Sequence, residues 1–118
     1  MHVLLLDDDT DFLAAASDAL EMLGHRVTAL ADARMALERL GGTPAIDVLI
    51  VDRLLGEGLS GSDVARQAHL GTPDLPVILL TGDPTQDGEE AMKVVPKTDG
   101  IYALKSALER IAEKLRPE

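Results

Sequence analysis

The chain has 118 residues, enough for one domain with one hydrophobic core. Its net charge of −10 and its two aromatic residues, Phe12 and Tyr102, argue against nucleic acid as a direct partner, because phosphate contacts need basic side chains and base stacking needs aromatic ones. There is no cysteine, which excludes disulfides, and no apolar run approaches the ~20 residues of a membrane span.

An apolar run at residues 3–6 leads directly into three carboxylates, Asp7, Asp8 and Asp9. A short continuous apolar run predicts a strand buried on both faces, as in the middle of a parallel sheet. Three adjacent acids repel one another, so packing alone does not explain them. Asp9 and Asp11 suit the N-terminal cap of a following helix, whereas Asp7 and Asp8 are better explained as metal ligands.

Strands and helices alternate along the rest of the chain. Apolar runs predict strands at 26–30, 46–51, 77–80 and 94–95. Periodicity, caps and glycines predict helices at 12–23, 33–40 and 101–115, one that begins at Ser62 or Asp63 and ends at Gly71, and at best a short one at 86–93. In the helix at 33–40, Met35 is expected to face inward together with Ala36.

This alternation predicts an α/β protein with a parallel sheet and helices on both faces. Right-handed crossovers leave few topologies, and they favour the strand order 2-1-3-4-5 for five strands. The carboxyl ends of all strands would then lie at one edge of the sheet.

Polar residues follow four of the predicted strands: Asp7 with Asp8, then Asp52, Thr81 and Lys97. At one sheet edge these residues can converge, and three carboxylates that meet there need a cation to offset their repulsion. Because the ligands are hard oxygens, Mg²⁺ is the expected ion. A lysine and a hydroxyl beside it suit phosphoryl transfer, in which a carboxylate can be the nucleophile and form an aspartyl phosphate.

These residues, in this order and at strand ends, resemble the receiver domain of response regulators over the whole chain, 1–118. The resemblance implies one doubly wound, flavodoxin-like domain in two-component phosphorelay signalling. It implies that Asp52 takes a phosphoryl group from a histidine kinase or a histidine phosphotransfer protein, with Mg²⁺ as cofactor. Such a domain catalyses only its own phosphorylation and dephosphorylation and is not an enzyme in the ordinary sense.

The resemblance also implies a role for each site residue. Asp8 and Asp52 would bind Mg²⁺ directly, Asp7 largely through water, and the backbone carbonyl of Leu54 would complete the protein ligands. Lys97 would pair with the phosphoryl oxygens. Thr81 would hydrogen-bond the phosphoryl group and report its presence.

The chain departs from the receiver pattern near its fifth strand. Receivers usually carry Lys-Pro, whereas here Lys97 precedes Thr98, and the aromatic switch position holds Val94. The sequence Leu80-Thr81-Gly82 and the short predicted helix after it resemble the receivers called FATGUY, although Asp83 stands where those have an aromatic. We therefore expect phosphorylation without the usual threonine–aromatic switch.

The same resemblance implies a cytoplasmic protein without direct contact to nucleic acid or membrane, and it leaves a weak homodimer open. A stand-alone regulator and a domain excised from a hybrid kinase are equally compatible with the sequence. The residues also leave two other functions open. Asp7-Asp8-Asp9-Thr10 fits the start of haloacid-dehalogenase-type phosphatases, which would use Asp7 and Asp9 but leave Asp52 unexplained. The other is a receiver-like binding module that is not phosphorylated.

Overall fold

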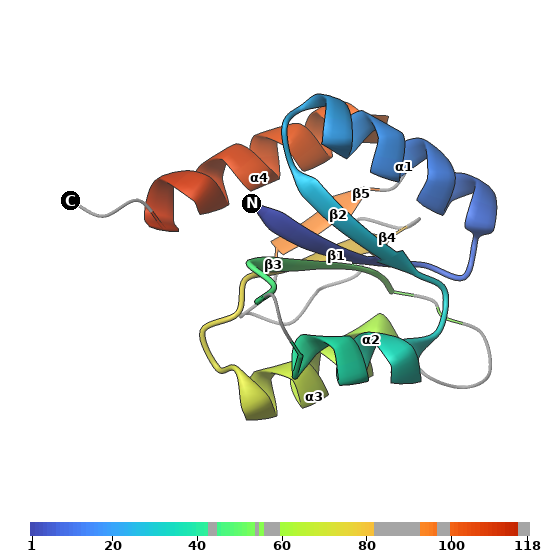
Figure 1. The fold of residues 1–118 in the computed structure, drawn as a ribbon, viewed down its shortest axis with the longest axis vertical. Coiled ribbons are helices and arrows are strands. Elements are labelled where there is room, and N and C mark those ends of the chain that lie inside the picture. Colours follow the sequence, from blue (N-terminus) through green and yellow to red (C-terminus); the bar gives the residue numbers. More distant parts are fainter. Residues whose placement is uncertain (43–44, 54, 56–59, 82–92, 97–99, 116–118) are drawn as a thin grey trace.

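The computed structural model describes residues 1–42, 45–53, 55, 60–81, 93–96 and 100–115. Strands and helices alternate along this part of the chain (Figure 1). The strands are β1 (His2–Leu6), β2 (Arg26–Leu30), β3 (Val48–Asp52), β4 (Val77–Thr81) and β5 (Lys93–Pro96). The helices are α1 (Thr10–Met22), α2 (Ala33–Leu40), α3 (Gly61–Gly71) and α4 (Gly100–Leu115).

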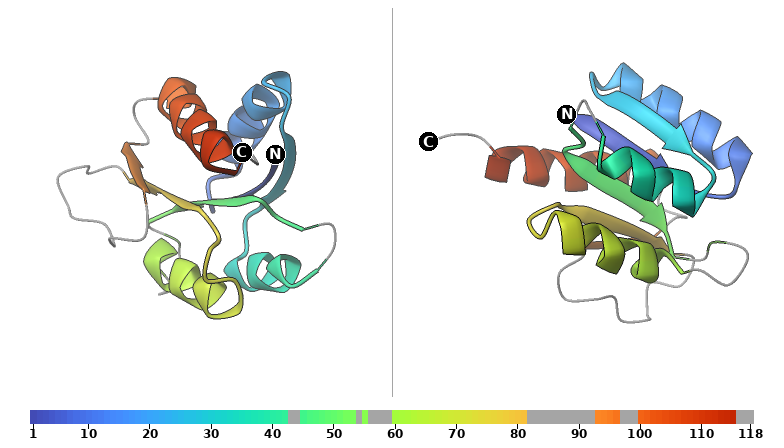
Figure 2. Two further views of the ribbon diagram at one scale, coloured as in Figure 1. Left: turned by 90° about the vertical axis from the view of Figure 1, so that its left-hand side faces the viewer. Right: turned by 60° about the horizontal axis from the view of Figure 1, so that its bottom comes forward.

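The strands form one parallel sheet in which β2, β1, β3 and β4 lie in the predicted order. The short strand β5 pairs with β4. Helices α1 and α4 cover one face of the sheet, and α2 and α3 cover the other (Figures 1 and 2). The α/β class and the placement of helices on both faces are therefore confirmed. None of the helices in the described ranges is long and apolar enough to cross a membrane.

The sheet separates two hydrophobic cores because successive side chains of a strand point to opposite faces. Val3 and Leu5 of β1 belong to the core under α1 and α4, whereas Leu4 and Leu6 belong to the core under α2 and α3. All four are fully buried. This burial on both faces is why β1 reads as a continuous apolar run rather than as an alternating one.

The start of α3 differs from the prediction. The helix begins at Gly61, with Ser60 as its N-cap, and not at Ser62 or Asp63. Ser60 and Asp63 form a capping box, in which the Ser60 hydroxyl accepts from the Asp63 N–H and the Asp63 carboxylate accepts from the Ser60 N–H. Asp63 is thus the third residue of the helix, which is the usual position of the acidic partner in this motif.

The packing of α2 differs from the prediction at Met35, which is 54% exposed. The fully buried residue of this helix is Ala36. Successive residues on a helix point about 100° apart. Because Ala36 points toward the sheet, Met35 points to the side of the helix. The strand β3 also begins later than predicted, at Val48 rather than at residue 46.

His2 is a buried polar residue at the start of β1. Its Nε2 lies 2.9 Å from the Thr28 hydroxyl, and its backbone N–H donates to the Asp47 carboxylate at 2.7 Å. Burial lowers the pKa of His2 below its ordinary value, and the nearby charges of Arg26 and Arg39 lower it further. The folded protein therefore favours the neutral imidazole.

The burial of His2 predicts a loss of stability in mild acid. Because the unfolded chain binds the proton more readily than the folded protein, the free energy of unfolding should fall as the pH decreases through 6.5, the ordinary histidine value. Urea denaturation at a series of pH values between about 7 and 5 measures this slope. His2→Gln should make the slope shallower, and an unchanged slope would contradict this account.

The packing of α1 on the sheet predicts that shortening a side chain of this helix lowers the free energy of unfolding only where the side chain is buried. Leu20 is fully buried, whereas Met22 is 88% exposed. Leu20→Ala should lower the free energy of unfolding by about 2–5 kcal/mol, because it removes buried methyl groups and leaves a cavity. The control Met22→Ala should change it by less than about 0.5 kcal/mol. Equal effects in chemical denaturation would contradict the packing described.

Candidate metal centre

Three carboxylates meet at the carboxyl edge of the sheet. β1 and β3 are neighbours in the sheet, and Asp7 and Asp8 follow the last residue of β1 while Asp52 is the last residue of β3. One carboxylate oxygen from each of Asp7, Asp8 and Asp52 lies within 4.8 Å of the others. The convergence predicted from the strand ends is therefore present in the structure.

The backbone after β1 fixes Asp7 in this cluster. Its N–H donates to the Leu30 carbonyl at 3.2 Å, which continues the pairing with β2 by one residue. Its Oδ1 accepts from the Asp9 N–H at 2.9 Å and so supports the turn into α1. Asp7 is fully buried, while Asp8 is exposed. Asp7 thus contributes both to the local backbone and to the cluster.

Asp9 has a different role from Asp7 and Asp8. It is the N-cap of α1, and its Oδ1 accepts from the N–H groups of Asp11 and Phe12, both at 3.1 Å. These hydrogen bonds satisfy two of the backbone N–H groups that have no partner within the helix at its N-terminus. The prediction that Asp9 is a cap is confirmed. A phosphatase site built on Asp7 and Asp9 does not match this arrangement, because Asp52 and not Asp9 completes the cluster.

Asp52 is the last residue of β3, and the chain after it leads to the start of α3. The next residue, Arg53, donates its N–H to the Leu80 carbonyl of β4 at 2.8 Å, and its own carbonyl accepts from the Gly61 N–H at 2.8 Å. These bonds hold the backbone of Arg53, directly after Asp52, to β4 on one side and to α3 on the other. Asp52 is 8% exposed, so the cluster opens to solvent mainly at Asp8.

The cluster is electrostatically suited to a hard divalent cation. Three carboxylates at this separation repel one another, and the repulsion is least screened for the two buried ones, Asp7 and Asp52. Carboxylate oxygens are the ligands that Mg²⁺ and Ca²⁺ prefer. A bound cation would offset the repulsion, and the exposed side at Asp8 leaves room for water or a substrate oxygen.

The other predicted site residues are described in part. Thr81 is the last residue of β4, and β4 is the neighbour of β3, so its backbone lies at the same edge as Asp52. Leu54, Lys97 and the helix predicted at 86–93, apart from Lys93 in β5, lie outside the described residues. The proximity of Gly61 and its cap Ser60 to Asp52 was not predicted from the sequence. The Ser-x-x-Asp capping signal at 60–63 could have placed the start of α3 there.

The family comparison agrees with this site. Residues 3–101 match the family model described as the response regulator receiver domain. The chain therefore belongs to the response regulator receiver family. It is a phosphoacceptor receiver domain of two-component signalling, with an acidic pocket of Asp7, Asp8 and Asp52, and not a classical enzyme.

Curated relatives of two lengths match the chain. It is 30% identical over 116 residues to the response regulator receiver protein CpdR of Brucella abortus, covering 93% of this chain and 95% of CpdR. It is 32% identical over 117 residues to the C4-dicarboxylate transport transcriptional regulatory protein DctD of Rhizobium meliloti. That match covers 97% of this chain but only 24% of DctD, so most of that longer protein has no counterpart here.

Solved structures share the fold. A response regulator receiver protein from Sinorhizobium medicae superposes with a TM-score of 0.83 at 25% identity, covering 94% of this chain and 93% of that one. The response regulator TrrA of Thermotoga maritima, in complex with Mg²⁺ and BeF, superposes with a TM-score of 0.83 at 22% identity, covering 93% and 97%. These likenesses confirm a flavodoxin-like receiver fold.

The crowded carboxylates predict that removing one charge stabilises the metal-free protein. Asp8→Asn should raise the free energy of unfolding in a chelating buffer by about 1 kcal/mol, the Coulomb energy of two unit charges ~4 Å apart in water. Asp18→Asn, which removes an exposed charge in the middle of α1, is the control. If both variants have the stability of the wild-type protein, the repulsion proposed for the cluster is absent.

Proposed function

We propose that Asp52 accepts a phosphoryl group from the phosphohistidine of a histidine kinase or a histidine phosphotransfer protein, with Mg²⁺ at the acidic cluster. The observation that carries this proposal is the approach of three carboxylates, from Asp7, Asp8 and Asp52, within 4.8 Å at one sheet edge. The structure reported for the Thermotoga maritima regulator, which holds Mg²⁺ and BeF, supports the choice of cation.

Each carboxylate of the cluster has its own proposed role in binding Mg²⁺. We assign direct Mg²⁺ ligation to Asp8 and Asp52 and a largely water-mediated contact to Asp7, with the Leu54 carbonyl as a further ligand. This division fits the structure at Asp7, whose Oδ1 already accepts the Asp9 N–H. When bound, Mg²⁺ neutralises charge on the carboxylates and on the phosphoryl oxygens.

Asp52 is the proposed nucleophile. One of its carboxylate oxygens attacks the phosphorus of the donor, the bond from phosphorus to the donor imidazole nitrogen breaks, and the electron pair of that bond leaves with the imidazole, which is then protonated. The product is an aspartyl acyl phosphate on Asp52. Water later attacks the same phosphorus and releases phosphate, which restores the carboxylate.

Thr81 and Lys97 are proposed to act on the phosphoryl group after transfer. The Thr81 hydroxyl would donate a hydrogen bond to it, which the end of β4 beside β3 supports. Lys97 would pair with its oxygens, and its place directly after β5 supports this, because β5 pairs with β4 in parallel. We propose that β5 completes the order 2-1-3-4-5 and that 1–118 is a single receiver domain of the FATGUY-like type.

The partners follow from the same chemistry. A histidine kinase or phosphotransfer protein must supply the phosphoryl group, and a net charge of −10 suits a basic docking surface on it rather than nucleic acid. We propose a cytoplasmic location, in keeping with the other receiver domains of two-component pathways. Because the chain matches only 24% of DctD, the activity of that whole protein is not part of this proposal.

The proposal predicts that Asp52→Asn abolishes covalent labelling. The wild-type protein should gain one phosphoryl group from a small acyl or amido phosphate when Mg²⁺ is present, and intact-mass spectrometry detects it. The asparagine variant should gain none, because an amide is a poor nucleophile. Asp18→Asn, which changes an exposed carboxylate in the middle of α1, should label like the wild type.

Three outcomes would contradict the proposal. Full labelling of the Asp52→Asn variant would place the phosphoryl group elsewhere. Continuous hydrolysis of a phosphate ester would favour the phosphatase. No labelling of the wild-type protein at any Mg²⁺ concentration would favour a receiver-like binding module.

A further inference from the structure

We propose that the start of α3, Gly61 fixed by its cap Ser60, is a positioning device that sets the place of the Asp52 carboxylate. This inference rests on the proposed function, in which Asp52 is the phosphoacceptor. The chain leaves the sheet after Asp52. Nine residues later, Gly61 lies against the backbone carbonyl of Asp52. The device therefore acts on the backbone of Asp52 and not on its side chain.

Gly61 approaches the Asp52 backbone more closely than any other residue type could. A Cβ added at Gly61 would lie 2.2 Å from the Asp52 carbonyl oxygen, 2.8 Å from its carbonyl carbon and 3.0 Å from the Arg53 Cα. All three atoms belong to the backbone, so no side-chain rotation relieves the overlap. Gly61 is buried, so the helix end is enclosed where it meets this peptide.

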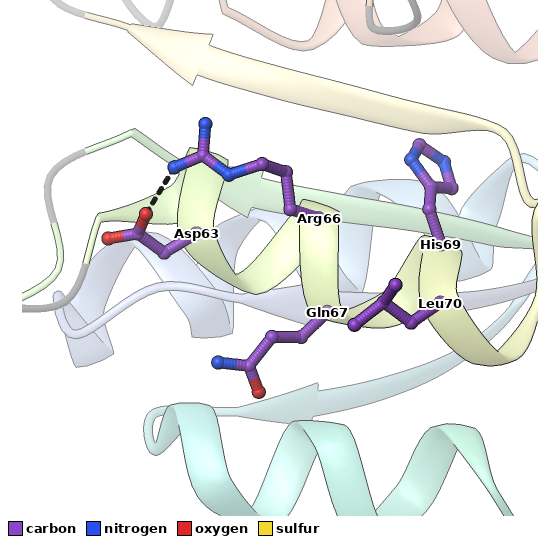
Figure 3. A pocket seen from close by; sticks show the side chains of 5 residues that line it. All are labelled: Asp63, Arg66, Gln67, His69 and Leu70. Atoms are coloured by element: carbon purple, nitrogen blue, oxygen red, sulfur yellow. Dashed lines mark hydrogen bonds and ion pairs between the residues drawn. The ribbon is translucent and has the colours of Figure 1, made fainter.

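Two sets of hydrogen bonds hold the helix end in this position. The Gly61 N–H donates to the Arg53 carbonyl at 2.8 Å, which joins the helix to the peptide after Asp52. The capping box of Ser60 and Asp63 closes the first turn. Asp63 also accepts from Arg66 on the outer face of α3, where both line a shallow pocket with Gln67, His69 and Leu70 (Figure 3).

The Asp63 carboxylate takes part in both the capping box and an ion pair with Arg66. The hydrogen bond from Arg66 lowers the pKa of Asp63 below its ordinary value, and the bonds with Ser60 lower it further. The ionised carboxylate accepts from the Ser60 N–H. The cap bonds stay within α3 and its N-cap, while the Gly61 contact joins α3 to Asp52. The cap therefore fixes the helix end, and the helix end fixes the Asp52 peptide.

A methyl group at this place would shift the reacting carboxylate. The added Cβ would start 2.2 Å from the Asp52 carbonyl oxygen, and even a tight contact requires 3.0–3.4 Å. The two atoms must therefore move apart by about 1 Å. A misplacement of about 1 Å can lower the rate of a reaction between positioned groups ~100-fold. Gly71, at the other end of the same helix, has nothing within 4 Å of an added Cβ and is the matched control.

The test compares Gly61→Ala with Gly71→Ala and with the wild-type protein. The rate constant for labelling by a small phosphodonor is measured at saturating donor and Mg²⁺, per molecule shown to be folded by circular dichroism. Mg²⁺ affinity is measured separately by calorimetry without any donor. Gly61→Ala should lower the labelling rate ~100-fold and weaken Mg²⁺ binding, whereas Gly71→Ala should change neither. A merely structural role would lower the fraction folded and leave the rate per folded molecule unchanged, which would overturn the proposal.

A second pair of variants decides the question if Gly61→Ala does not fold. Ser60→Ala removes one cap bond of α3, and Asp32→Ala removes the equivalent cap of α2, which follows β2 and not β3. Ser60→Ala should slow labelling about fivefold, and Asp32→Ala should leave it unchanged. Equal rates for the two variants would overturn the positioning role. An unlabelled wild-type protein would instead overturn the proposed function, so the two failures are distinguishable.

Discussion

The mutual repulsion of Asp7, Asp8 and Asp52 is the constraint on which the site depends. Their oxygens lie within 4.8 Å, two of the residues are buried, and the two fully buried strands β1 and β3 deliver them to one place. The buried sheet contributes the free energy that holds these like charges together. A divalent cation relieves the repulsion, so the same feature that opposes folding favours metal binding.

The fold and the carboxylate cluster could be predicted from the sequence because both follow from short-range patterns. Continuous apolar runs identify strands buried on both faces, and parallel strands bring their carboxyl ends to one edge. Asp52 is far from Asp7 in sequence, yet the topology alone predicts their contact. The different roles of Asp9 and of Asp7 and Asp8 were also predictable, since Asp9 occupies the cap position before a helix.

What the sequence could not show depends on contacts between distant segments. The capping signal at 60–63 is readable in the sequence, but the fit of Gly61 against the Asp52 peptide is not. The burial of His2 likewise requires Thr28 and Asp47 from other segments. Met35 is apolar and lies in an amphipathic helix, but its exposure depends on how α2 is rotated on the sheet.

The most direct test of the account is a crystal structure of the protein with Mg²⁺ and beryllofluoride. The account predicts one Mg²⁺ ligated by Asp8 and Asp52, reached from Asp7 through water, with the beryllium bonded to the Asp52 carboxylate. We also expect the start of α3 to keep its close approach to the Asp52 backbone, where a Cβ added at Gly61 would lie 2.2 Å from the carbonyl oxygen. A beryllofluoride group on Asp7 or Asp9, or a cation bound away from the three carboxylates, would contradict it.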